Sequence, residues 1–275
     1  MKKFIVLLLS AVVAFSTPSC TPDGKLNLFS LAEERAFGLQ VTQEIEGNPS
    51  DYPILPRSSN REAYSYVEGI MNLLLESDLV NYDRSKFEWS ITIIEQNVIN
   101  AFAAPGGQLF FYTGFLKYAQ SEAELAGVIA HEIAHSDRRH ATTRMTRVYG
   151  LQLLSSILLG EAAGSLVGIV ADLSIGIASL SFSRNNEFEA DEFAVRYLHS
   201  IRDRRNYDAT AIKDFFDRLV EDGMAQDNGG GNFLRTHPYG GPRKDNIDRV
   251  WRSLGSPEGN KFVAEYADFK RNHLP

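Results

Sequence analysis

His131, Glu132 and His135 lie within five consecutive residues of sequence HEIAH. Ser121 and Glu124 form a capping-box pattern before them, and apolar residues with helical spacing follow, so these side chains are expected on one helix. Residues four apart on a helix differ by about 40° in direction and about 6 Å in height, so both imidazoles can reach one metal ion. Zinc suits two such imidazoles, and the glutamate between them can take a proton from a water at the metal. Ordinary surface residues on a helix are the alternative.

A zinc site of this kind needs a third protein ligand. The extended metzincin pattern would place glycine at position 138 and histidine at 141, where this chain has arginine and alanine, so that subclass is excluded. Downstream, Glu187 and Asp191 lie on the apolar face of a second expected helix, and burying an unpaired carboxylate costs at least several kcal/mol. Glu187 as a zinc ligand and Asp191 as the acceptor for a ligand histidine N–H would satisfy both groups. Ion pairs with Arg184 and Arg196 are the alternative.

Three runs of sequence together resemble one family of metallopeptidases. The runs are NVINAFAAPGG, HEIAH and SRNNEFEAD, and their order and spacing are similar to those of the HtpX/BepA/Oma-type enzymes, the forty-eighth metallopeptidase family. The resemblance covers nearly the whole chain after its first 27 residues. It implies a gluzincin whose zinc ligands are His131, His135 and Glu187. It further implies that Glu132 is the general base and that Asp191 contacts a ligand side chain and not the metal itself.

The resemblance also implies the family's compact catalytic domain, a mostly helical α+β fold with a small β-sheet beside the active-site helix. Alternating apolar and polar residues predict one strand at 87–93, and glycines bound a second at 108–113. In the resembled family a strand at this point forms the sheet edge along the cleft, and such an edge can bind an extended peptide through its free N–H and C=O groups. The expected substrate-binding residues are Gly107, Gln108, Leu109, Phe110 and Phe111. A central strand without a free edge is the alternative.

Capping signals and helical periodicity predict the remaining elements. Helices are expected at about 31–46, 60–76, 208–224 and 243–254, with a last helix that ends near residue 271. The apolar stretch from 149 to 182 is interrupted by Glu161 and Asp172, so two buried or cleft-covering helices are expected there in place of a membrane span.

His237-Pro238 followed by Arg243 matches a further feature of the family. Because three zinc ligands and a base are already assigned, a fourth protein ligand would close the position of the water. His237 could cap the zinc in a latent state, or it could donate a hydrogen bond to the tetrahedral oxyanion while Arg243 helps to neutralise that charge. A turn before a helix, with His237 simply solvated, is the alternative.

The other histidines are not expected to bind metal. His140 lies five residues after His135, a rotation of about 140° around a helix, so a surface position is expected. His199 and His273 have no motif around them.

The N-terminus has the pattern of an export signal, with Lys2 and Lys3, an apolar run and a short polar segment before Cys20. Cys20 is the single cysteine of the chain and lies where such a signal would be cut. Attachment of a lipid explains it, and ordinary cleavage that leaves a free thiol is the alternative. The expected organisation is a signal peptide at 1–19, an anchor and short linker at 20–29, and one zinc metallopeptidase domain at 30–275.

Composition limits the class of function. A net charge of −7 argues against nucleic acid as a partner. Hydrophobic residues at 44% and charged residues at 23% are ordinary for a globular domain with a sizeable core.

Together these features predict an extracytoplasmic zinc metalloendopeptidase that binds polypeptides in extended form and cleaves unfolded or misassembled proteins. A lipid on Cys20 would hold it at the periplasmic face of a bacterial membrane, with the outer membrane favoured. A zinc-bound chaperone or assembly factor with little proteolysis is the alternative from another class, and the intact Glu132 argues against it. An aminopeptidase would need an acidic anchor for a free N-terminus, and the sequence has no such motif.

Overall fold

The computed structural model describes residues 19–159, 181–224, 233–238 and 241–275. The signal peptide expected at 1–19 lies almost wholly outside the described residues. Residues 160–180 of the apolar stretch, where two buried or cleft-covering helices are expected, also lie outside the described residues.

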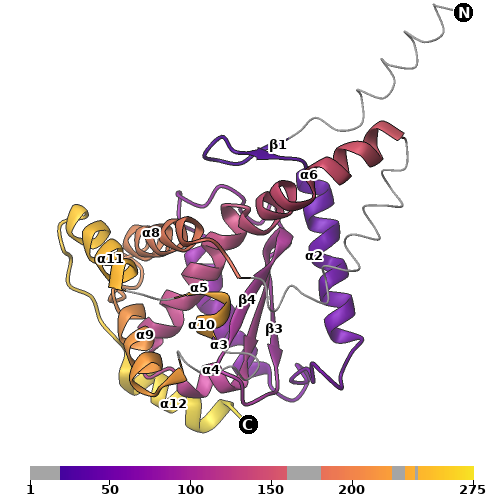
Figure 1. Ribbon diagram of the computed structural model, residues 1–275. Coiled ribbons are helices and arrows are strands. Elements are labelled where there is room, and N and C mark those ends of the chain that lie inside the picture. Colours follow the sequence, from indigo (N-terminus) through magenta and orange to yellow (C-terminus); the bar gives the residue numbers. More distant parts are fainter. Residues whose placement is uncertain (1–18, 160–180, 225–232, 239–240) are drawn as a thin grey trace, which may run out of the picture.

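Most of the described chain is helical, with a small sheet and a short N-terminal β-ribbon (Figure 1). The helices are α2 (Leu31–Glu46), α3 (Arg61–Leu74), α4 (Thr113–Tyr118), α5 (Glu122–Asp137), α6 (His140–Leu159), α8 (Arg184–Ser200), α9 (Ile212–Glu221), α10 (Phe233–Thr236), α11 (Gly241–Ser253) and α12 (Val263–His273). The mostly helical α+β fold predicted from the sequence is confirmed, and the predicted helices agree with the observed ones to within a few residues.

The sheet contains β3 (Ser90–Ile94), β4 (Ala101–Ala104) and β5 (Gln108–Tyr112) in the order β3-β5-β4. β3 is parallel to β5, and β4 is antiparallel to β5. A turn of 3-10 helix, η1 (Pro105–Gly107), joins β4 to β5, and Gly106 and Gly107 have φ angles of 72° and 91° there. Glycine adopts positive φ without the steric cost that a side chain would add, so this sequence can turn tightly.

The prediction that Gly107–Phe111 form a sheet edge is wrong. β5 is the central strand, because Leu109 pairs with Ile91 on one side and with Ala103 on the other. Its backbone groups are therefore engaged in the sheet and cannot receive a peptide. The edge strand beside α5 is β4, whose alanine-rich sequence has a weak strand propensity and gave no signal of its own.

Alternate residues of the strands face two separate cores. In β5, Leu109 and Phe111 pack with residues of α3 and α5, whereas Phe110 and Tyr112 pack with residues of α2. The helices thus cover both faces of the sheet, with α2 on one side and α5 on the other (Figure 1).

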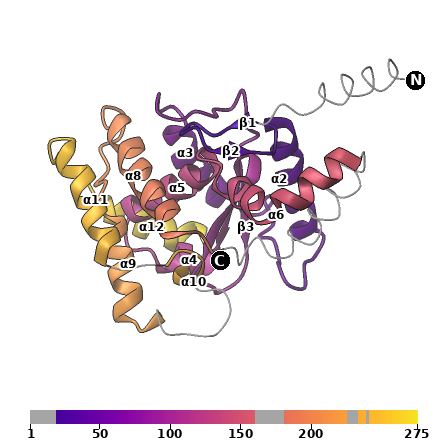
Figure 2. The same ribbon diagram turned by 45° about the horizontal axis from the view of Figure 1, so that its top comes forward.

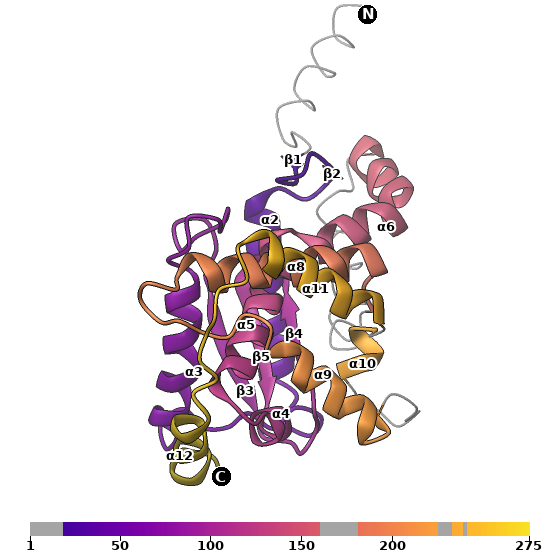
Figure 3. The ribbon, with the colours of Figure 1, turned by 90° about the vertical axis from the view of Figure 1, so that its left-hand side faces the viewer.

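Helix α5 occupies the centre of the molecule, and all of its residues are buried. The Ser121 hydroxyl accepts a hydrogen bond from the backbone N–H of Glu124, which caps the helix as the sequence predicts. α8 packs against α5, and α11 packs against α8 (Figure 3). This packing places α8, and through it α11, beside α5, although both are distant from α5 in the sequence.

The N-terminal ribbon pairs β1 (Ser19–Cys20) with β2 (Leu26–Asn27) in antiparallel register and lies beside α6 (Figure 2). Asn27 is fully buried, and its side-chain amide donates to the Thr142 hydroxyl of α6. The segment expected to form an anchor and linker is therefore attached to the domain by a buried hydrogen bond. Within the described ranges, no helix is long and apolar enough to cross a membrane.

Candidate metal centre

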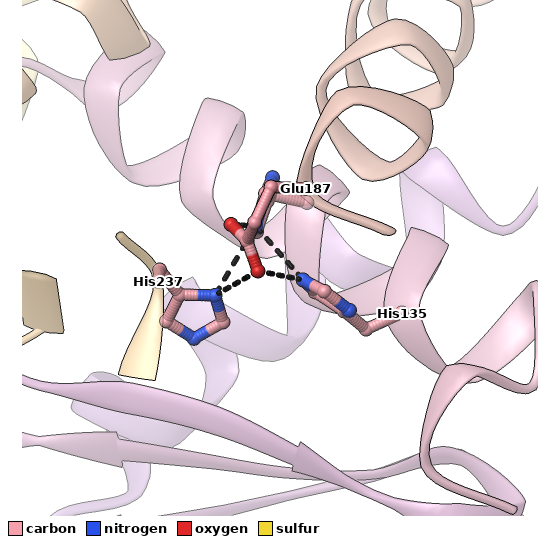
Figure 4. A group of neighbouring side chains, drawn as sticks. His135, Glu187 and His237 are labelled. Carbon is pink, nitrogen blue, oxygen red and sulfur yellow. Dashed lines mark hydrogen bonds and ion pairs between the residues drawn. The ribbon is translucent and has the colours of Figure 1, made fainter. Parts of the chain in front are cut away.

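Four side chains from three segments converge on one buried point. His131 and His135 come from α5, Glu187 comes from the first turn of α8, and His237 comes from the turn after α10. Their candidate ligand atoms all lie within 4.8 Å of one another. Figure 4 shows His135, Glu187 and His237 pointing toward one another. The structure thus brings the three predicted ligands together and adds His237 to them.

The spacing of these atoms suits a metal ion. His135 Nε2 lies 3.0 Å from His131 Nε2, and each nitrogen lies 3.4 Å from an oxygen of Glu187. His237 Nδ1 lies 3.4 Å from both His131 Nε2 and a Glu187 oxygen. Within the described part of the chain, neither oxygen of Glu187 makes a hydrogen bond of good geometry, although Arg243 Nη1 is 2.8 Å from one of them. Buried lone pairs that face each other in this way need a cation between them, so the residues fit a metal ion.

Asp191 and Arg243 contact the cluster but are not among its candidate metal ligands. Asp191 Oδ1 lies 3.0 Å from Nδ1 of His131, an ion-pair contact whose angle is not that of a good hydrogen bond but which places the carboxylate where it can orient a ligand histidine. The Arg243 guanidinium binds Asp191 in bidentate fashion at 2.6 and 2.7 Å. Arg243, which lies on α11, therefore pairs with Asp191 and also approaches Glu187. Arg196, one of the two partners weighed from the sequence, instead binds Glu192 on its own helix.

These contacts shift the acidity of the cluster. Burial opposes charge on His131, but Asp191 and Glu187 together raise its pKa to about 9. Burial likewise disfavours a charged Glu187, but Arg243 and His237 hold the pKa of this carboxyl well below its usual range. For His135, burial outweighs the effect of Glu187 and lowers the pKa well below the ordinary value. The shifts favour an ionised Glu187 and a neutral His135, the forms that coordinate metal, whereas His131 must release a proton when a metal binds.

Glu132 lies beside the cluster but does not belong to it. Its carboxylate is fully buried, its oxygens accept no hydrogen bond of good geometry from the described residues, and His237 Nε2 lies 3.4 Å from Oε1. Burial raises the pKa of Glu132. A carboxylate with free lone pairs and a raised pKa next to a metal site is suited to accept a proton.

The prediction that His140 is a surface residue is wrong. Its exposed fraction is 1%, and its Nδ1 lies 2.9 Å from Nδ1 of His135. The rotation argument assumed one continuous helix, but α5 ends at Asp137 and Arg139 has a positive φ of 58°. His140 therefore starts a new helix and points back toward the metal ligands. A positive φ at arginine has no sequence signal, so this contact could not be predicted.

A buried group of two histidines and a glutamate, with a second glutamate between the histidines, is the arrangement of a metallopeptidase. The sequence model of peptidase family M48 matches residues 65–250. The chain belongs to peptidase family M48, and the family predicted from the three sequence runs is confirmed.

Curated relatives agree with this assignment. The mitochondrial metalloendopeptidase OMA1 of Arabidopsis thaliana is 30% identical over 155 residues, which are 56% of this chain and 30% of the relative. The beta-barrel assembly-enhancing protease of Escherichia coli K12 is 31% identical over 204 residues, or 70% of this chain and 38% of the relative. Human mitochondrial metalloendopeptidase OMA1 is 26% identical over 257 residues, or 88% and 48%. The chain thus spans less than half the length of each of these relatives.

Proposed function

We propose that this chain is a zinc metalloendopeptidase that cleaves unfolded or misassembled proteins outside the cytoplasm. The observation that carries the proposal is the buried cluster of His131, His135 and Glu187 with the buried carboxylate of Glu132 next to it. Metallopeptidase relatives that share the family support the reaction class.

Zinc is the metal that we propose for the cluster. Imidazole and carboxylate donors in a four-coordinate arrangement favour zinc, and ligand atoms about 2.1 Å from a tetrahedral ion lie roughly 3.4 Å from each other. Most of the distances between the donor atoms are 3.4 Å. Calcium and magnesium prefer six or more oxygen donors, so they suit this set poorly.

Each residue then has a defined task in peptide hydrolysis. A bound zinc ion supplies a Lewis acid for the scissile carbonyl and lowers the pKa of the attacking water. Glu132 takes the proton of that water and passes it to the leaving amine, for which its raised pKa is suitable. Asp191 fixes the orientation of His131, and Arg243 holds Asp191 and Glu187 in place.

We further propose that the described arrangement is a latent state. With His237 as a fourth donor, the coordination position that a water needs is filled. His237 follows the short helix α10, so its displacement would open the site without moving α5 or α8. Arg243 is engaged with Asp191 and Glu187, which makes a direct role on the oxyanion less suitable for it.

The proposed substrate is an extended polypeptide. With β5 enclosed in the sheet, the edge strand β4 is the element that could add a peptide strand next to α5. Relatives named for beta-barrel assembly support a role in the quality control of envelope proteins. We propose a lipid on Cys20 and a periplasmic site at the outer membrane, which is the placement that fits an export signal followed by a single cysteine.

Cleavage of an unfolded protein tests the proposal. Reduced casein is incubated with the purified protein as isolated, after removal of metal with a chelator, and after zinc is restored. We expect internal cuts, mapped by mass spectrometry, that disappear without metal and return with zinc. Binding of casein without cuts, both by the zinc-loaded wild type and by zinc-loaded His237→Ala in which a latent site would be open, would instead favour the chaperone. Cuts confined to the N-terminus would identify an aminopeptidase.

A further inference from the structure

The second ligand histidine, His135, has an unusual partner. Its Nε2 faces His131 and Glu187, so this nitrogen must present its lone pair to a metal, and its proton must be on Nδ1. The atom that faces Nδ1 is not a carboxylate or a carbonyl oxygen, but Nδ1 of His140 at 2.9 Å. Two nitrogens at this distance can share only one proton, so His140 accepts the hydrogen bond.

This requirement fixes the proton of His140 as well. A neutral imidazole that accepts at Nδ1 carries its proton at Nε2, and Nε2 of His140 lies 3.4 Å from Oε2 of Glu189. Arg138 Nε donates to the other oxygen of Glu189 at 2.7 Å, and Lys25 Nζ of the N-terminal ribbon lies 3.1 Å from Oε2. The chain of contacts therefore runs from Lys25 through Glu189 and His140 to His135.

Among the described residues, the surroundings of this contact would not replace His140 as the acceptor. His135 and His140 are 2% and 1% exposed, so bulk water does not reach the contact. Phe182 stacks on the His135 ring with centroids 4.0 Å apart, which holds the ring face but offers no acceptor. Removal of His140 would leave a buried N–H without a partner, and the ring could then place its proton on the nitrogen that faces the metal.

We propose that His140, supported by Glu189, is a positioning residue that keeps His135 in the tautomer able to bind the metal. The two ligand histidines of α5 are then oriented by different means, His131 by the carboxylate of Asp191 and His135 by a neutral imidazole. The inference rests on the proposed role of His135 as a zinc ligand.

Two substitutions at position 140 distinguish the loss of a hydrogen-bond acceptor from a change in side-chain volume. His140→Asn places an amide oxygen near the position of Nδ1, whereas His140→Leu has similar bulk and no acceptor. His199→Leu is the matched control, because His199 is a partly buried histidine on α8 outside the metal cluster. Zinc affinity is measured by competition with a chromophoric chelator, with the metal ion alone as the probe.

We expect His140→Leu to weaken zinc binding by about 10- to 100-fold, the range for losing an orienting partner of a ligand. His140→Asn should stay within about threefold of the wild type because it restores the acceptor. His199→Leu should match the wild type. Nitrogen–proton correlation spectra of the histidine-labelled, metal-free proteins provide a second readout. They should show His135 protonated at Nδ1 in the wild type and in His140→Asn, and a gain of the Nε2-protonated form in His140→Leu.

Equal zinc affinity in His140→Leu and the wild type would overturn the inference, as would equal weakening by the asparagine and leucine variants. If His140→Leu does not fold, the spectrum and affinity of His140→Asn still decide, because the wrong tautomer in that variant contradicts the proposal. A wild-type protein that binds no zinc would refute the proposed function as well, which separates the two failures.

Discussion

The proposed function gives Glu132 a role in catalysis and none in binding the metal. It does not belong to the group of side chains that can hold the ion, yet its free carboxylate oxygens lie beside that group. We expect Glu132→Gln to keep one zinc ion per chain while peptide hydrolysis falls by roughly a hundredfold or more, because an amide cannot take the proton. Metal analysis and casein cleavage check both parts. Loss of zinc in this variant would mean that Glu132 is a ligand.

His237 gives the second prediction at this scale. If it caps a latent site, His237→Ala should raise the rate of cleavage several-fold, since a position for water opens, and should weaken zinc binding because one donor is lost. If it donates to the oxyanion, the same change should lower kcat by roughly a hundredfold with little effect on zinc. His273→Ala, which changes an exposed histidine at the end of α12, is the control. Rates and zinc affinity equal to the wild type would exclude both roles.

At the scale of elements, the stability of α5 decides whether the site is assembled. Ser121 is 1% exposed, and its substitution by alanine leaves the buried N–H of Glu124 without an acceptor. We expect Ser121→Ala to lower the free energy of unfolding by about 1–2 kcal/mol, or the Tm by about 2–8 °C.

Ser30→Ala is the comparison, because Ser30 caps α2 through a similar contact but is partly exposed. Its loss should cost less, about 0.5–1 kcal/mol. Thermal unfolding of the metal-free proteins measures both changes. A smaller effect at Ser121 than at Ser30 would contradict the central role of the α5 cap.

The elements also show what a sequence can and cannot predict here. His131, His135 and Glu187 could be assigned because helical spacing and a resembled family converge on the same positions. Strand β4 could not be predicted, because alanines carry little strand preference and because the order of strands depends on long-range pairing. The position of His140 was missed for a related reason, since the break after Asp137 depends on the local backbone and leaves no mark in composition or spacing.

At the scale of the whole molecule, the proposed lipid on Cys20 predicts where the protein is found. We expect Cys20→Ala, expressed from its own signal in a bacterial host, to move the protein from the membrane fraction to the soluble fraction, because the acyl chains would be its strong anchor. Fractionation followed by a high-salt wash measures the change, and Ser19→Ala is the control beside it. A Cys20→Ala protein that stays with the membrane after the wash would require a different anchor.

The N-terminal ribbon would determine where such an anchor lies relative to the domain. Cys20 lies in a strand that pairs with Leu26, Asn27 is bonded to α6, and Lys25 reaches Glu189 on α8. A lipid attached there would connect the bilayer to the domain through this ribbon. The metal centre would then lie within a limited distance of the membrane, so we expect substrates to be cleaved only where they come that near to the lipid surface.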